Sequence, residues 1–204
     1  MNRLAAITIF LWTLSLTNLA YASTAQEAVK KASDQVLAAL KTDREKIKAD
    51  PEYVYGLVTD IILPHFDFPG MAQWVLGKYW RRADEAQRAR FIEEFKNLLV
   101  RTYATALVEY SDETIEYLPI RSAAGAESVI VRTEIHQKGG KPLAVAYTMH
   151  TVGGDWKVYD INIGGMSLVS NYRNTFASQI RRSGLDGLLK TLASHNKKLK
   201  NNIQ

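Results

Sequence analysis

The hydrophobic residues of this 204-residue chain change their spacing twice, and that change decides the class of fold. Over residues 23–110 they recur at the 3.6-residue period of a helix, and over residues 112–163 mostly at the two-residue period of a strand. The helical period returns over residues 167–199. Consecutive strands between two blocks of helices predict an α+β fold, in which helices pack on a curved, four-stranded antiparallel sheet.

Capping residues predict where several helices begin and end. Asp67 and the proline two residues later open a short helix that Gly77 closes. Asp84 and Gln87 have the spacing of a capping box at the start of the longest helix. Gly184 ends the helix that follows the strands.

The middle block contains four predicted strands with glycines in the connections between them. Their predicted bounds are Thr114–Leu118, Ser128–Gln137, Leu143–Val152 and Trp156–Ile163. The short connections predict an antiparallel meander. In the third strand, Val145 and Tyr147 fall on one face and Ala144 and Ala146 on the other, a pattern typical of a central strand.

The first 22 residues have the composition of an export signal. Behind a cationic start, an apolar run reaches Leu19 and is followed by Ala20 and Ala22 at the −3 and −1 positions of a cleavage site. The run is short for a membrane anchor, and no basic stop-transfer flank follows it. We therefore expect cleavage after Ala22 and a mature exported protein, residues 23–204, with a single domain.

Composition excludes several kinds of chemistry. The chain has no cysteine, which removes disulfides, thiolate catalysis and cysteine-based metal sites. The net charge is +5, but an exported protein rarely meets nucleic acid. Much of the excess lies near the C-terminus, where the basic residues are either a solvated tail or a contact with an anionic surface. These residues are Arg181, Arg182, Lys190, Lys197, Lys198 and Lys200.

The polar residues do not predict an enzyme. The four histidines His65, His136, His150 and His195 lack the spacing of metal ligands, so no metal is expected. No serine lies in a nucleophile elbow. The motif search therefore yields no catalytic residue.

Large apolar and aromatic residues fall on helix and sheet faces that would confront each other. The candidates are Tyr103, Leu107, Tyr110, Val131, Val145, Tyr147, Met149, Val169, Tyr172 and Phe176. Periodicity alone favours an ordinary packed core for these residues. The alternative is a cavity between the sheet and the helices, lined by the same side chains.

Several segments resemble one protein family and occur in its order across nearly the whole mature chain. They are Leu63–Phe66, Val75–Trp80, Gln87–Phe95, Trp156–Arg173 and Gly184–Leu188. Together they resemble the signature of the MlaC (toluene-tolerance auxiliary) family. The chain departs from the family at Gly164, where an acidic residue is frequent.

The resemblance implies a periplasmic carrier without catalytic activity or cofactor, whose cargo is a diacyl phospholipid. It implies transfer between an outer-membrane MlaA lipoprotein complex and an inner-membrane ABC transporter containing MlaD, which maintains outer-membrane lipid asymmetry. The implied fold is similar to an NTF2-like cradle with added helices, and the acyl tails lie between sheet and helices. Arg173, Arg181 and Arg182 are then candidates for transient contact with the headgroup or a partner, or are ordinary surface charges.

Two other functions stay open from the sequence. NTF2-like cradles also host enzymes, which here would need an acid–base pair such as Tyr147 with Asp160. A protein with fully packed aromatic faces would instead be a lipid-free adaptor. Exposing two acyl tails of about sixteen carbons to water costs on the order of 20 kcal/mol, at about 0.8 kcal/mol per methylene. The site of a carrier must therefore be apolar, so that it offsets this cost.

Overall fold

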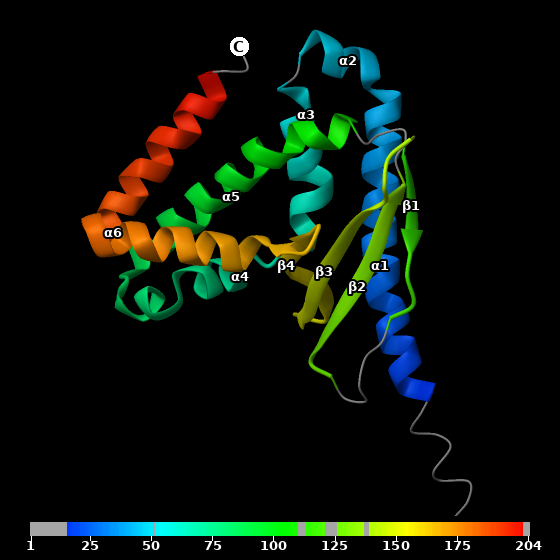
Figure 1. Cartoon of the computed structure of the whole chain (residues 1–204), viewed down its shortest axis with the longest axis horizontal. Helices are drawn as coiled ribbons and strands as arrows, with labels where there is room; N and C mark the ends of the chain where they lie inside the picture. The colour runs from blue at the N-terminus through cyan, green and yellow to red at the C-terminus, as the bar shows by residue number, and fades with distance from the viewer. Residues whose placement is uncertain (1–15, 51, 110–112, 121–125, 137–138, 202–204) are drawn as a thin grey trace, which may run out of the picture.

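The computed structural model describes residues 16–50, 52–109, 113–120, 126–136 and 139–201 (Figure 1). The helical elements before the sheet are α1 (Leu16–Thr42), α2 (Arg44–Ala49), α3 (Tyr53–Leu57), η1 (Val58–Ile62), η2 (Leu63–His65), α4 (Phe68–Leu76), η3 (Gly77–Arg82) and α5 (Glu85–Glu109). The strands are β1 (Thr114–Tyr117), β2 (Ser128–His136), β3 (Leu143–Val152), β4 (Asp155–Ile163) and β5 (Met166–Ser167), and α6 (Leu168–Asn201) follows. No helix in the described ranges is long and apolar enough to cross a membrane.

The sheet is an antiparallel meander in the order β1-β2-β3-β4-β5, as the short connections predict. The prediction of four strands is one too few. Gly164 and Gly165 have φ values of 58° and 91°, which glycine adopts without strain. The tight turn that they form brings Met166 opposite Ile163, and this two-residue pairing is β5. A strand of two residues is too short to show the alternation of apolar and polar residues by which strands are predicted.

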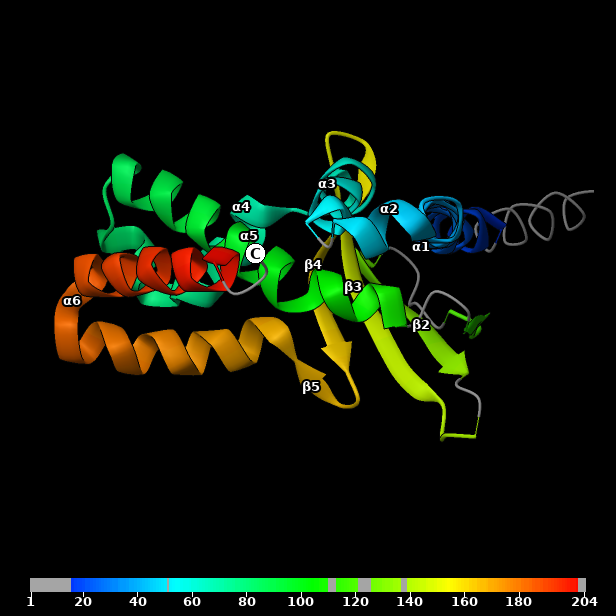
Figure 2. The ribbon, with the colours of Figure 1, turned by 90° about the horizontal axis from the view of Figure 1, so that it is seen from above.

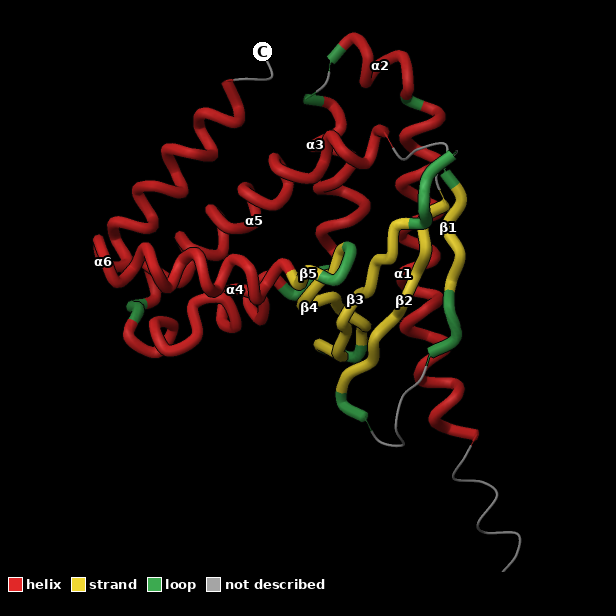
Figure 3. The backbone as a smooth tube through the Cα atoms, in the orientation of Figure 1, coloured by secondary structure: helices red, strands yellow, loops and turns green. Residues whose placement is uncertain are grey.

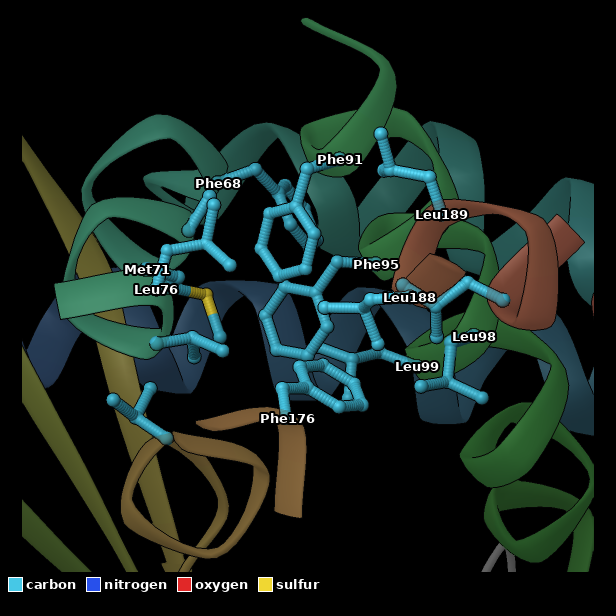
Figure 4. Packing of buried hydrophobic residues seen from close by; sticks show 14 of the residues in the cluster. Phe68, Met71, Leu76, Phe91, Phe95, Leu98, Leu99, Phe176, Leu188 and Leu189 are labelled. Atoms are coloured by element: carbon cyan, nitrogen blue, oxygen red, sulfur yellow. The ribbon is translucent and has the colours of Figure 1, made fainter. Parts of the chain in front are cut away.

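Figures 1 and 2 show the helices α4, α5 and α6 beside the sheet, with α1 running along the sheet at the other side of the molecule. The core between α4, α5 and α6 is aromatic (Figure 4). The ring centre of Phe95 lies 5.6 Å from Phe91, 5.4 Å from Tyr172 and 6.1 Å from Phe176. The rings of Phe91 and Phe95 are stacked, whereas Tyr172 and Phe176 meet Phe95 edge to face, and both kinds of contact add to the stability gained from burial.

Two further clusters complete the core. Under α1, Ala25 and Val29 pack with Val131 and Met149 of the sheet. The third cluster joins α1, α2, α3, η1 and α5. Leu63 packs against the first and third clusters, whereas Phe66 packs against the first and second. The η2 segment and the residue after it therefore connect all three clusters.

The helix ends agree with most of the capping signals. Asp84 and Gln87 form the predicted box, since Gln87 N donates to Asp84 Oδ1 at 2.8 Å and Asp84 N donates to Gln87 Oε1 at 3.2 Å. Asp67 caps α4 by accepting from Gly70 N at 2.9 Å. At Gly184, with φ 71°, α6 bends sharply (Figure 3). The structure does not describe residues 1–15, so most of the predicted leader lies outside it.

Candidate functional site

The register of the strands divides the side chains of the sheet between two faces, because cross-strand partners point the same way. We call the face that α1 covers the inner face, since Val129, Val131 and Met149 pack there against Ala25 and Val29 of α1. The inner face continues through the paired residues of the other strands. Its members are Ile115, Tyr117, Val129, Val131, Thr133, Ile135, Leu143, Val145, Tyr147, Met149, Thr151, Trp156, Val158, Ile161, Ile163 and Met166.

Burial along the inner face falls from one end to the other. Val129, Met149 and Val158 are buried beneath α1. At the opposite end Ile163 is only half-buried, and Met166 is 59% exposed. We call this second region the open end of the inner face. It consists of Ile115, Ile135, Leu143, Ile163 and Met166.

The C-terminal half of α5 also presents apolar side chains that are only half-buried. These are Val100, Tyr103, Leu107 and Val108. The chain keeps this part of α5 close to the open end, since only four residues separate Glu109 from Thr114 of β1, and Thr114 pairs with His136. The body of α5 packs on α3, α4 and α6. Two apolar surfaces, one from the sheet and one from α5, therefore occur near the same end of the molecule.

The hydroxyl groups of Thr133 and Tyr147 lie next to each other on the inner face. Thr133 is 1% exposed, and its Oγ1 donates to Val145 O at 3.3 Å. The Tyr147 hydroxyl contacts Thr133, and burial raises the pKa of Tyr147 to about 12. Tyr147 therefore stays protonated at physiological pH and adds no charge to the inner face.

The acid–base pair of the enzyme alternative does not form. Tyr147 pairs with Ile161 on the inner face, whereas Asp160 pairs with Thr148 on the other face. The carboxylate of Asp160 is also occupied, because it accepts from Ser167 Oγ at 2.6 Å and from Val169 N at 3.1 Å.

The predicted lining residues that the structure describes are divided among different clusters of the core. Val169, Tyr172 and Phe176 belong to the aromatic core of the helical layer, together with Tyr103. Burial and the nearby Tyr103 hydroxyl raise the pKa of Tyr172, as expected for a phenol in a packed core.

The other predicted residues are divided between the remaining parts of the molecule. Val131, Tyr147 and Met149 belong to the cluster under α1, and Leu107 to the third cluster. Val145 is 7% exposed and adjoins Ile163 of the open end. Tyr110 lies outside the described residues.

A surface pocket of about 480 Å³ lies between α1 and the η1–η2 segment. It is lined by Gln35, Ala38, Asp60, Ile61, Pro64 and His65. None of the predicted lining residues borders it. The five residues of the open end were not among the predicted site residues, although strand alternation already places Ile135 on the same face as Val131.

Comparison with known proteins identifies the family. A model of the MlaC protein family matches residues 30–194, which extend from α1 through most of α6. The chain belongs to the MlaC family. It is 30% identical over 166 residues to the toluene tolerance protein ttg2D of Pseudomonas putida, covering 81% of this chain and 77% of that protein.

Two further relatives carry names that describe a ligand. The MlaC binding protein of the Haemophilus influenzae intermembrane phospholipid transport system is 27% identical over 187 residues, covering 90% of this chain and 87% of that protein. The phospholipid-binding protein from Ralstonia solanacearum, solved in complex with a phospholipid, superposes with a TM-score of 0.80 at 38% identity, covering 86% of this chain and 98% of that one.

The segment that most resembles the MlaC signature has a structural role here. Asp160 on β4 and Ser167 together cap α6, since Ser167 Oγ also accepts from Ser170 N at 3.0 Å. Gly164 N donates to Ala144 O at 2.9 Å, and its positive φ explains why glycine suits this position better than an acidic residue.

We expect Asp160→Ala to lower the free energy of unfolding by about 1–3 kcal/mol, because α6 loses two hydrogen bonds to a charged acceptor at its start. Asp160→Asn should have a smaller effect, since the amide oxygen still accepts one bond. Urea unfolding of the three proteins measures the difference. An alanine variant as stable as the wild type would contradict this role.

Proposed function

We propose that this chain is a periplasmic phospholipid-binding protein that transfers phospholipids between membrane complexes and thereby maintains outer-membrane lipid asymmetry. The observation that carries the proposal is the likeness, over nearly its full length, to the Ralstonia solanacearum protein that holds a phospholipid. Sequence identity at that level, together with the same fold, supports a shared ligand class.

The acyl tails would lie between the open end of the inner face and the C-terminal half of α5. Both surfaces are apolar, and their side chains are only half-buried in the chain alone. A tail placed there removes apolar surface from water at about 0.8 kcal/mol per methylene. If a bound tail fills the space between the two surfaces, it buries the apolar side chains that are half-exposed without it.

This placement changes the set of lining residues. Val145, Tyr147, Tyr103 and Leu107 stay as candidates, because they adjoin the two surfaces. Ile163 and the rest of the open end join them. Val131, Met149, Val169, Tyr172 and Phe176 would act as the rigid core that holds the two surfaces apart.

The partners follow from the same proposal. A carrier must exchange its cargo with complexes in both membranes, for which the family offers an outer-membrane MlaA lipoprotein complex and an inner-membrane transporter containing MlaD. The name of the Haemophilus influenzae relative, which places it in an intermembrane phospholipid transport system, supports this assignment. Binding and release without covalent chemistry suffice for that task.

Bound phospholipid should raise the melting temperature of the protein. A ligand at about 100 times its Kd stabilises the folded state by about 2.7 kcal/mol. For a chain of this size that corresponds to a rise of roughly 5–10 °C. Calorimetry of protein stripped by organic extraction, and of the same sample reloaded with phosphatidylethanolamine, measures the shift. Equal midpoints would contradict the proposal.

A further inference from the structure

Two segments of the helical layer carry the net charge of the whole chain. Residues 77–90 and 173–187 contain eight basic and three acidic residues, a net charge of +5, which equals the formal net charge of all 204 residues. The net charge of all the other residues is therefore zero. The basic residues are Lys78, Arg81, Arg82, Arg88, Arg90, Arg173, Arg181 and Arg182.

The fold brings these segments together, although more than 80 residues separate them in sequence. Gln87 Nε2 donates to Asp186 Oδ1 at 2.9 Å, which joins the start of α5 to the bend of α6. Arg173 lies against Gly77, where its Nη2 is 3.3 Å from the position that a Cβ would occupy. In Figures 1 and 2, η3 and the bend of α6 lie at the same end of the molecule. We call these two segments together the cationic end.

The basic residues of the cationic end outnumber its acidic residues Asp84, Glu85 and Asp186 by five. Elsewhere, lysines pair with acidic residues of their own helix, as Lys48 does with Glu45 and Lys96 with Glu93. Within the described residues, no ion pair involves a basic residue of the cationic end. An excess of like charges in two neighbouring segments projects a field that attracts and orients an anionic partner.

The composition of the cationic end favours a protein over a bilayer. Seven of its eight basic residues are arginine, whose planar guanidinium binds carboxylates through two parallel hydrogen bonds and is enriched at protein interfaces. Insertion into a bilayer also needs exposed apolar side chains. The large exposed ones in the described ranges, Trp74, Ile130, Val152 and Met166, all lie outside the two segments.

We propose that the cationic end docks the carrier on an acidic protein surface of a membrane complex. This inference rests on the proposed function as a carrier. The sheet lies at the other side of the molecule in Figure 1. A partner held at the cationic end would therefore leave the open end of the inner face free to load or release a tail.

Charge reversal at the bend of α6 tests the docking surface. The variant is Arg181→Glu with Arg182→Glu, and the matched control is Lys197→Glu with Lys198→Glu, which reverses two exposed charges farther along the same helix. The probes are the immobilised periplasmic domain of MlaD, the immobilised MlaA complex, and vesicles of phosphatidylglycerol and phosphatidylethanolamine. All are measured at low salt by biolayer interferometry.

We expect the association rate constant of the arginine variant with at least one of the two protein probes to fall by about tenfold or more. The reason is that electrostatic steering depends on the charge near the docking surface. The lysine variant should stay within about twofold of the wild type. Equal losses in both variants, or no loss in either, would overturn the proposal. Binding to the vesicles that the arginine variant alone loses would assign the surface to the membrane and also overturn it.

A separate readout keeps this test independent of the proposed function. The phosphate content of each purified variant reports bound phospholipid. Normal lipid with normal docking by the arginine variant would refute the docking surface alone. A wild-type protein without phospholipid would refute the carrier, whatever the docking result.

Discussion

Ile163→Asp is expected to reduce the phospholipid that co-purifies with the protein to less than about a tenth of the wild-type amount. Ile163 lies at the open end of the inner face, beside Val145 and opposite Met166. A carboxylate there would have to lose its water when an acyl tail covers it, at several kcal/mol per ion. Since about 1.4 kcal/mol is a factor of ten in affinity, binding should weaken at least a hundredfold.

The matched control is Ile130→Asp. Ile130 pairs with Thr148 on the face of the sheet opposite to the inner face and is exposed, so a charge there meets water in every state. Phosphate analysis after chloroform–methanol extraction measures the lipid in each protein. Equal lipid in the two variants, both folded by circular dichroism, would mean that the tails do not contact the open end.

Phe176→Ala is expected to lower the free energy of unfolding by about 3–5 kcal/mol, the usual cost of truncating a buried phenylalanine. Phe176 is buried on α6, and its ring contacts Phe91 at 5.8 Å and Phe95 at 6.1 Å between centres. Because these neighbours are fixed by three helices, the space left by the ring cannot collapse. The loss should be the same with and without bound lipid.

Trp74→Ala is the control for this prediction. Trp74 is an aromatic residue of the same helical layer that is 55% exposed and stacks only on Tyr159 among the described rings. Its removal should cost less than about 1 kcal/mol. Unfolding by guanidinium, repeated on stripped and loaded samples, separates stability from lipid binding. A Phe176 variant that keeps its stability but loses its lipid would move the tail site into the aromatic core.

Strand alternation predicted the inner face, but it could not predict which part of that face is open. Val131 and Ile163 have the same pattern in sequence. They differ in the structure because α1 lies over Val131 and not over Ile163. The position of α1 is set by packing between segments about 100 residues apart, which no local pattern contains.

Helical periodicity has a related limit. It placed Tyr172 and Phe176 on the buried side of α6, and the structure agrees. It could not tell whether that side faces the sheet or other helices, because both present apolar surfaces. The capping signals at Asp67 and Asp84 were read correctly because each depends on residues only three positions apart.

The cationic end was only partly visible in the sequence. Arg173, Arg181 and Arg182 were selected there, whereas Arg81 and Arg82 were not. The two groups meet because the Gln87–Asp186 hydrogen bond and the packing of α4 and α5 on α6 bring distant segments together. A charge count along the chain cannot show this.

Mass spectrometry of an organic extract tests most directly whether fatty tails occupy this protein. The whole chain, including the predicted leader, should be expressed and the protein purified from the periplasm without detergent. The account predicts intact diacyl phospholipid at close to one molecule per chain. A lipid-free extract from folded protein would contradict it and would favour an adaptor that holds no cargo.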